Sequence, residues 1–378
     1  MIGNLDYSTL QQLWWLICSV VGSLFLFLTF VQGGQTLIFT TATTEEEKSL
    51  IINTMGRKWE LTFTTLVLFG GALFAAFPLF YATSFGGAYW VWMLILFTFI
   101  LQAVSYEYRK KPNNALGART YEIFMFINGS VGILLIGAAV GTFFSGSRFS
   151  LTMYNSVAWG TPFHGLEAAL NLFNLSFGLF LVFLARVLGA MYIVNHVDHE
   201  PLVKRARKAT LINLVLALPF LLVILISLVT MDGYAVDPAT GSIFIEKGKY
   251  LHNLLAMPVV LVLLLGGLVS VVYSVVATAF LGKNSGIWFG GVGTVLVGLA
   301  IFSLAGYNNT AFYPSMSDLQ SSLTIYNASS SKYTLTVMSY VAIAVPFVLG
   351  YIAYVWKLMD AKKLTLAELT SEDSNEMY

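Results

Sequence analysis

The stretch ATLINLVLALPFLLVILISLVTM, residues 209–231, contains no charged side chain. An apolar helix of about 20 residues crosses the hydrocarbon core of a lipid bilayer, and a helix pairs its backbone polar groups within the segment. A run of this length and composition is therefore predicted to be a transmembrane helix. On both sides of it, the chain alternates between similar apolar runs and shorter polar connections.

Nine such runs predict an all-α integral membrane protein. Only 10% of the 378 residues are charged and 57% are hydrophobic, with a mean hydropathy of +0.76, whereas about a quarter of the residues in a soluble domain are charged. These values exclude a water-soluble fold. The polar connection 41–58 is expected to form a short surface helix. The predicted transmembrane helices lie near residues 12–32, 61–83, 86–106, 120–144, 166–187, 209–231, 253–281, 286–307 and 335–357.

The distribution of lysine and arginine predicts the orientation of these helices. Cytoplasmic segments of membrane proteins are enriched in basic residues. With nine spans and the N-terminus outside, all 20 basic residues fall in segments predicted to be cytoplasmic except Arg148, Lys247, Lys249 and Lys332. The N-terminus is therefore expected outside the cell and the C-terminus inside.

The chain is expected to form one polytopic membrane domain, residues 1–360, followed by a cytoplasmic tail. The tail, residues 361–378, is poor in apolar side chains and is expected to be partly disordered. A nucleic-acid partner is not expected, because the net charge is only +1 and the basic residues sit in short loops. The single cysteine, Cys18, excludes an intrachain disulfide and a cysteine-based metal cluster.

Three glutamates are the candidate functional residues. Ionisable groups at membrane depth are costly and therefore point to function. Glu60 opens the second helix, Glu107 closes the third and Glu122 lies near the start of the fourth, so all three are expected at the cytoplasmic side, where they could form a proton path. The alternative is structural: helix dipoles favour Glu60 and Glu122 at helix N-termini, and Glu107 pairs with Arg109 or Lys110.

The four histidines are poorly placed for haem. His196 and His199 lie in a basic loop, where solvation is the expected state. His164 and His252 lie near the outer ends of the fifth and seventh helices, and a bis-histidine haem site there is the less favoured alternative. Glu167 lies one helical turn after His164 and is expected to pair with it. No metal ligand and no catalytic residue is therefore predicted in this chain.

Several motifs occur in a consistent order along the chain. Residues 70–85 read GGALFAAFPLFYATSF, residues 106–111 read YEYRKK, and residues 321–338 read SSLTIYNASSSKYTLTVM. The pair Trp14–Trp15, the order Trp59–Glu60 and the run Gly189 to Tyr192 add weaker agreement. Together these motifs resemble subunit II of the cytochrome bd quinol oxidases over nearly the whole chain.

The resemblance implies a nine-helical subunit that pairs with a haem-bearing subunit I in the bacterial inner (cytoplasmic) membrane. The complex would oxidise quinol from the membrane pool and reduce dioxygen to water, with haem b and haem d held by subunit I. The resemblance also assigns the acidic residue after the tryptophan, here Glu60, to a proton-uptake path. It leaves open the quinol type, a small third subunit, and a structural quinone or lipid on this subunit.

The chain departs from the family pattern in two stretches. Many members carry a DGFD-type motif late in the first helix, whereas this chain has Gln32, Gly33, Gly34 and Gln35. Family members often carry an arginine before an FDYR-like run, here residues 106–111, and the corresponding residue in this chain is Gln102. Glutamine cannot relay a proton by ionising. Two other classes therefore stay open: a polytopic secondary transporter, which needs ionisable groups near the bilayer midplane, and a structural scaffold that tolerates Glu60→Gln.

Overall fold

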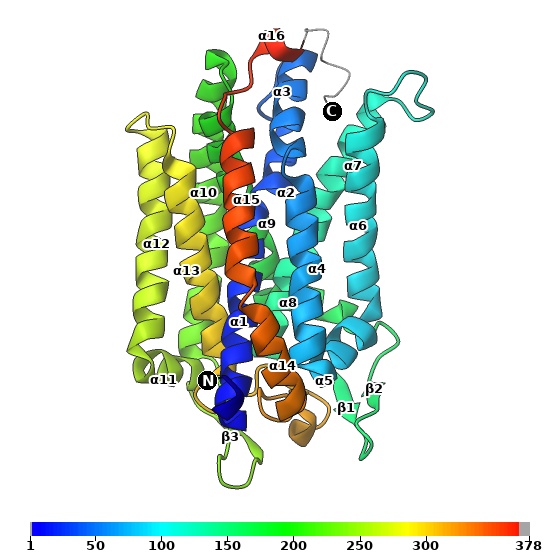
Figure 1. The fold of residues 1–378 in the computed structure, drawn as a ribbon, viewed down its shortest axis with the longest axis vertical. Coiled ribbons are helices and arrows are strands. Elements are labelled where there is room, and N and C mark those ends of the chain that lie inside the picture. Colours follow the sequence, from blue (N-terminus) through cyan, green and yellow to red (C-terminus); the bar gives the residue numbers. More distant parts are fainter. Residues whose placement is uncertain (1, 370–378) are drawn as a thin grey trace.

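The computed structural model describes residues 2–369, which form a bundle of long helices aligned with the long axis of the molecule (Figure 1). Within this range, nine helical segments are long and apolar enough to cross a membrane, as predicted. They are Tyr7–Phe39, Glu45–Ala76, Tyr89–Tyr108, Ala118–Ser145, Leu172–His196, Glu200–Thr230, Pro258–Ala279, Gly286–Gly306 and Lys332–Met359.

Several spans are assembled from consecutive helical elements. In chain order the elements of the spans are α1 (Tyr7–Leu28), α2 (Phe30–Thr36) and η2 (Leu37–Phe39); α3 (Glu45–Gly56) and α4 (Trp59–Ala76); α6 (Tyr89–Tyr108); α7 (Ala118–Ile127), η4 (Asn128–Gly132) and α8 (Ile133–Ser145); α9 (Leu172–His196); α10 (Glu200–Thr230); α12 (Pro258–Ala279); α13 (Gly286–Gly306); α14 (Lys332–Ala342) and α15 (Val345–Met359).

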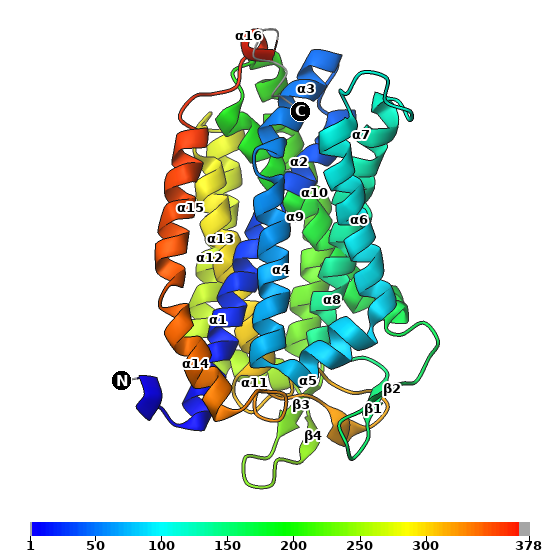
Figure 2. The same cartoon turned by 45° about the vertical axis from the view of Figure 1, so that its right-hand side comes forward.

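The two ends of the bundle differ. The end that holds the start of α1, here called the N-terminal end, carries two short antiparallel hairpins, whereas α3 and α16 lie at the opposite, C-terminal end (Figures 1 and 2). The connecting elements are η1 (Ile2–Asn4), α5 (Pro78–Tyr81), η3 (Ala82–Gly87), β1 (Phe149–Leu151), β2 (Val157–Trp159), η5 (Leu166–Leu170), β3 (Gly233–Val236), β4 (Ile243–Glu246), α11 (Lys249–Ala256), η6 (Leu319–Ser321) and α16 (Leu366–Leu369).

Helix α9 forms the centre of the bundle and packs against α2, α8, α10 and α13. Its contact with α2 is close because glycines face each other across it. A Cβ atom built on Gly189 would lie 2.3 Å from the backbone nitrogen of Gly34, and one on Gly33 would lie 2.0 Å from the carbonyl of Ala185. Small residues at these positions allow the two backbones to touch.

Two predictions about the helices are wrong: the limits of the fifth span and the surface position of the helix in segment 41–58. The fifth span was expected over 166–187 but runs from Leu172 to His196, because Gly165 takes a left-handed conformation (φ 87°) and Asn171 caps the helix by accepting from the Phe173 amide. The segment 41–58 does contain a helix, α3, but not at the surface. Its apolar side chains from Leu50 to Ile52 are fully buried in the bundle.

The described part of the predicted tail packs against the bundle. Leu364 is buried, its amide donates to the His196 carbonyl at 2.8 Å, and its carbonyl accepts from the Asp198 amide at 2.9 Å. The chain then enters α16, which contacts α3. The expected disorder of residues 370–378 lies outside the described residues.

Candidate functional site

The three predicted glutamates lie in different environments. Glu60 is in the first turn of α4 and is exposed, and its carboxylate makes no hydrogen bond or ion pair with any residue from 2 to 369. Glu107 is also exposed, on α6. Glu122 is only 1% exposed. No interaction among the described residues joins the three carboxylates to one another.

Glu122 is the centre of a buried ionic network. Its Oε1 accepts from Arg109 through Nε at 3.0 Å and through NH2 at 2.7 Å, and its Oε2 accepts from Lys48 Nζ at 3.2 Å. Arg109 also donates to Ser49 and pairs with Glu45 at 3.4 Å. Of the two partners that the structural alternative offers Glu107, Arg109 turns inward to Glu122 instead. The network ties α3, α6 and α7 together.

Below this ionic network, towards the middle of the bundle, lies a network of buried amides. Gln35 Nε2 donates to Asn128 Oδ1 at 2.9 Å, and Gln35 Oε1 accepts from Gln102 Nε2 at 2.8 Å and from Tyr106 Oη at 3.1 Å. Gln32 Nε2 donates weakly to Gln102 Oε1 at 3.3 Å. Gln102 thus contacts both Gln32 and Gln35, so the three glutamines that depart from the family pattern belong to one network. Amide side chains carry no ionisable proton near neutral pH.

Glu60 directly follows Trp59, which contacts this amide network. The preceding residue, Trp59, stacks on Tyr106 with ring centroids 5.9 Å apart and an angle of 11° between the planes. Tyr106 in turn donates to Gln35. The exposed carboxylate of Glu60 is therefore next in the chain to a side chain that stacks on a member of the buried network.

A second ionic cluster, centred on Asp360, was missed from the sequence. Asp360 pairs with His196 Nε2 at 2.8 Å and with Lys58 Nζ at 3.1 Å, and accepts from Tyr192 Oη at 3.2 Å. Burial raises the pKa of the Asp360 carboxyl, but the hydrogen bond and charge of His196 and the charge of Lys58 outweigh it and leave the pKa below its ordinary value. Asp360 is the last residue of the predicted membrane domain, and its local sequence gives no sign of these partners.

The expected solvation of His196 and His199 is wrong. His196 is only 8% exposed and is held between Asp360 and the Tyr192 carbonyl. His199 Nε2 lies 3.1 Å from Glu47 Oε1, which also binds Arg205. Both histidines have carboxylate partners because α9 ends and α10 begins within a folded part of the C-terminal end.

The expected pair of His164 with Glu167 is also wrong. His164 has a left-handed backbone (φ 43°), and its Nδ1 lies 3.2 Å from the Gly87 carbonyl. Glu167 Oε1 instead accepts from the Thr161 hydroxyl at 2.6 Å. The spacing of one helical turn does not bring the side chains together, because residues 161–165 form a turn and not a helix.

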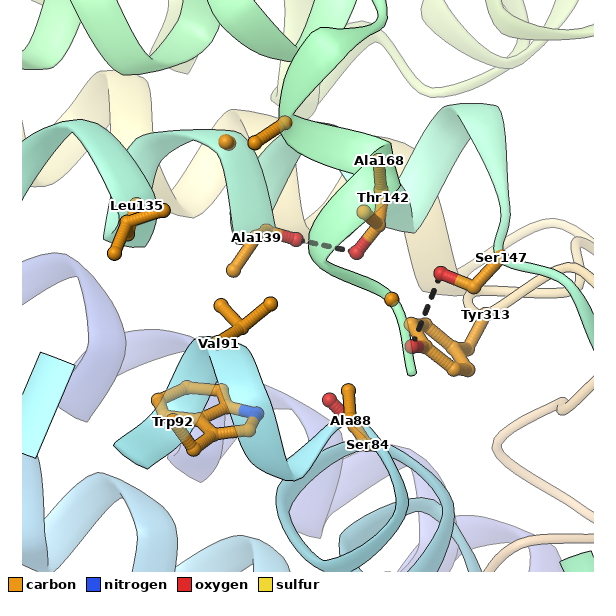
Figure 3. A pocket seen from close by; sticks show the side chains of 13 residues that line it. Ser84, Ala88, Val91, Trp92, Leu135, Ala139, Thr142, Ser147, Ala168 and Tyr313 are labelled. Carbon is orange, nitrogen blue, oxygen red and sulfur yellow. Dashed lines mark hydrogen bonds between the residues drawn. The ribbon is translucent and has the colours of Figure 1, made fainter. Parts of the chain in front are cut away.

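A small cavity lies at the N-terminal end between α6, α8 and η5 (Figure 3). Its volume of about 20 Å³ is room for a single water. Tyr313 and Ser147 line it and are joined by a hydrogen bond of 3.2 Å. Burial raises the pKa of the Tyr313 phenol. The cavity is too small for a substrate.

A much larger cavity, about 420 Å³, opens between α1, α4 and the pair α14–α15. Its walls are mostly aliphatic. Thr65 is the one hydroxyl side chain of the lining, and Phe27 and Trp356 are its aromatic residues. Such a lining fits a hydrocarbon chain and offers few groups that could orient a polar head.

Comparison with known proteins identifies the family. A family model described as cytochrome bd terminal oxidase subunit II matches residues 10–359. The chain belongs to this family. It is 28% identical over 368 residues to cytochrome bd-I ubiquinol oxidase subunit 2 of Escherichia coli (strain K12), a match that covers 94% of this chain and 95% of that protein.

Other relatives agree with this assignment of the subunit. Cytochrome bd ubiquinol oxidase subunit 2 of Bacillus subtilis (strain 168) is 26% identical over 91% of this chain and 94% of its own length. The solved structure of the bd oxidase from Geobacillus thermodenitrificans contains a chain with the same fold, at a TM-score of 0.67 and 13% identity, covering 93% of this subunit and 98% of that chain.

Membership of the subunit II family makes this protein part of a terminal oxidase complex, an oxidoreductase, and favours that reading over a secondary transporter. The subunit's own histidines do not fit a haem site. Each has a different protein partner, and His164 stacks near Tyr89 whereas His252 is largely exposed beside Glu246. The described residues contain no group of three or more His, Cys, Asp or Glu side chains suited to a metal ion.

Proposed function

We propose that this subunit pairs with a haem-bearing subunit I in the bacterial cytoplasmic membrane, and that the complex oxidises quinol and reduces dioxygen to water. The family match and the relatives named as ubiquinol oxidase subunits support this proposal. Haem b and haem d are assigned to subunit I. The concentration of basic residues supports placing the C-terminal end, with α3 and α16, in the cytoplasm.

Within this function, we propose that Glu60 takes up protons from the cytoplasm. The observation that carries the proposal is an exposed carboxylate without a described partner at the start of a transmembrane helix, beside the Trp59–Tyr106–Gln35 contacts. A carboxylate held in this way is free to bind a proton and release it. Exposed Glu107, on α6 at the same end, would collect protons from the cytoplasm.

Glu122, the third glutamate of the predicted path, has a different part in this proposal. Two cations, Arg109 and Lys48, bind its carboxylate directly. Neutralising it would leave the buried Arg109 with only the exposed Glu45 as a counter-charge. We assign Glu122 to holding α6 and α7 in place beside the path, with proton transfer carried by the other two glutamates.

The face of α4 and α6 is the proposed contact surface for subunit I. Glu60, Thr64 and Gly71 lie on one exposed side of α4, together with exposed apolar side chains. A carboxylate on a membrane helix is costly in lipid and is acceptable at a protein interface with access to water. The exposed apolar side chains of this face are Val67, Leu68 and Phe74 on α4 and Met93, Phe97 and Ile100 on α6.

The cavity between α1, α4 and α14–α15 is the proposed place for a structural quinone or lipid. Its volume and aliphatic walls fit an isoprenoid or acyl chain. Mass spectrometry of compounds extracted from the purified complex would identify the occupant.

The test begins with the complex purified from its native membrane in mild detergent. A reduced-minus-oxidised spectrum with b- and d-type haem signals, travelling with a second membrane subunit, is the expected result. Glu60→Gln should then slow quinol-dependent oxygen uptake by about 10-fold or more, since general acid–base groups contribute at least that much. The haem spectrum should not change.

Glu200→Gln is the matched control, because Glu200 is an exposed carboxylate in the first turn of α10 at the same end. It should leave oxygen uptake unchanged. If Glu60→Gln supports full turnover, the proton path does not run through Glu60 and the scaffold reading gains support. A haem-free protein that purifies alone, while other complexes survive the procedure, would refute the oxidase proposal itself.

A further inference from the structure

Arg186 is a partly exposed arginine within the candidate membrane span Leu172–His196, and no described acidic residue pairs with it. It lies in α9, about 15 Å from the end of the helix at His196, at 1.5 Å per residue. Its Nε donates to Asn213 Oδ1 at 2.8 Å, and its NH2 donates to Thr40 Oγ1 at 3.3 Å. Neither partner is charged.

Several other cations of the same end have acidic partners, although Arg207 instead donates to the Thr278 and Gly282 carbonyls and to Asn284 Oδ1. Arg109 pairs with Glu122, Lys58 with Asp360, and Arg205 with Glu47. Among the residues that the structure describes, Arg186 forms no ion pair with a carboxylate. A charge on a membrane-spanning helix requires compensation wherever it meets hydrocarbon, because hydrocarbon cannot solvate it.

The guanidinium of Arg186 keeps donors available. An arginine has five N–H groups in a planar fork, and the two hydrogen bonds to Asn213 and Thr40 occupy two of them. The Thr40 contact lies at the exposed side of the group, and Thr40 itself is exposed. The guanidinium therefore faces the surface of the bundle with N–H groups available. Two such groups in one plane match two oxygens of one phosphate.

Below Arg186, the seam between α9 and α10 is apolar. Phe183, one turn deeper on α9, stacks on Phe220 of α10, with ring centroids 5.9 Å apart and an angle of 8° between the planes. Ile212 and Leu216 flank Asn213 on α10 and are about half exposed. The surface therefore changes from cationic at Arg186 to apolar at Phe183 and Phe220 within a few helical turns. This order matches an amphiphile that has a charged head group and an apolar chain.

This seam is separate from the face proposed for subunit I. Helix α10 packs against α9, α11 and α12, whereas α6 packs against α7, α8, η3 and η4. The neighbourhood of α2, α9 and α10 can be followed in Figure 2. An occupant of the seam would therefore be in contact with the surrounding lipid.

We propose that Arg186, together with Thr40, binds the phosphate of an anionic phospholipid whose acyl chain lies over the Phe183–Phe220 seam. The phosphate supplies the counter-charge that no described side chain supplies, and the apolar seam favours a lipid over a free anion. Asn213 is a positioning residue, because its amide oxygen fixes the guanidinium from inside the bundle.

The test compares the purified two-subunit complex of wild type, Arg186→Gln and Arg186→Lys. Native mass spectrometry and phosphate-based lipid analysis would measure the anionic phospholipid retained by each. The wild type should retain one more anionic phospholipid per complex than Arg186→Gln. Arg186→Lys should retain it weakly, because an ammonium lacks the bidentate fork.

A second measurement uses delipidated complex and keeps the proposal testable if Arg186→Gln assembles poorly. Vesicles that contain phosphatidylglycerol should raise the Tm of the wild type relative to vesicles of phosphatidylcholine alone, because a ligand of the folded state stabilises it. Lys208→Gln, which removes an exposed cation from the same end of α10, should keep the full increase. Arg186→Lys should lose most of it.

Three outcomes would overturn the proposal. Equal lipid retention by wild type and Arg186→Gln would show that Arg186 does not hold a lipid. An increase in Tm with inorganic phosphate, but not with phosphatidylglycerol, would indicate a free-anion site. Loss of subunit I from Arg186→Gln with unchanged lipid content would mean that an acid of subunit I supplies the counter-charge.

Discussion

Glu122 and Asp360 each hold a buried cation at the C-terminal end, and single residues there decide local stability. Removing one partner of a buried ion pair costs more than the pair contributes, because the other charge is left in the interior. Glu122→Gln leaves Arg109, only 4% exposed, without its main counter-charge. We expect the complex to lose about 3 kcal/mol of stability, seen as a lower Tm.

The control for this prediction is the exposed Glu200, which pairs with Lys204 across one turn of α10 at 3.6 Å. Exposed pairs contribute little, so Glu200→Gln should change the Tm hardly at all. An unchanged Tm for Glu122→Gln with slowed oxygen uptake would contradict the structural role and return Glu122 to the proton path.

Asp360 gives a prediction on pH. Its pKa in the folded subunit is lowered by His196 and Lys58, in spite of the opposing effect of burial. A carboxyl with a lowered folded pKa contributes stability above its unfolded pKa, about 3.9, and this contribution disappears as the pH falls through the folded value. The Tm of the wild type should therefore fall more steeply below about pH 4 than that of Asp360→Asn. Parallel curves would contradict the pairing.

Sequence reasoning found Glu122 but not its partners, and it missed Asp360. Hydropathy identifies a carboxylate near a membrane helix, since that is a local property. It does not say that Arg109 turns inward to Glu122, or that the chain after Met359 returns to meet His196. The first pairing depends on how the end of α6 meets α7, and the second joins residues far apart in the sequence through the packing of α9 against the end of α15.

At the scale of the elements, the amide network joins α2, α6 and the π-helical segment η4. Gln35 provides both an acceptor and a donor to this network. Gln35→Leu keeps the approximate volume but leaves buried polar groups of Asn128, Gln102 and Tyr106 without their partner. The expected loss is about 1–3 kcal/mol for each group left unsatisfied, measured as a lower Tm of the complex.

Gln12→Leu is the matched control for Gln35→Leu, because Gln12 is an exposed glutamine on the neighbouring helix α1 that donates to Tyr326. It should have a small effect. If Gln35→Leu is as stable as the control and turns over normally, then the network neither holds the helices nor takes part in proton uptake.

The element scale also shows which parts of the fold the sequence could predict. Nine apolar runs gave nine spans among the described residues, because length and composition determine whether a helix can cross a bilayer. Burial of α3 could not be predicted in this way, because polar side chains such as Glu47 and Lys48 make it look like a surface segment. Their charges are compensated by Arg205 and Glu122 from other helices.

At the scale of the whole molecule, the bundle has an exposed face that its own helices leave uncovered. Gly71 lies on this face of α4, and a Cβ atom built there would meet nothing within 4 Å. Small residues in membrane helices allow a neighbouring helix to approach closely. Since the residues 2–369 provide no such neighbour at Gly71, the proposed arrangement with subunit I supplies one.

Gly71→Trp should therefore weaken the assembly of the two subunits without unfolding this one. We expect less subunit I, and a smaller haem signal, to co-purify with an affinity-tagged Gly71→Trp variant than with the wild type.

Gly266→Trp on α12 is the matched control, because Gly266 also has open space around it and α12 does not belong to the proposed contact face. If both variants retain subunit I equally, the α4 face is exposed to lipid and the partner docks elsewhere. In that case Glu60 would face hydrocarbon, and the energetic argument for its role in proton uptake would fail with the interface.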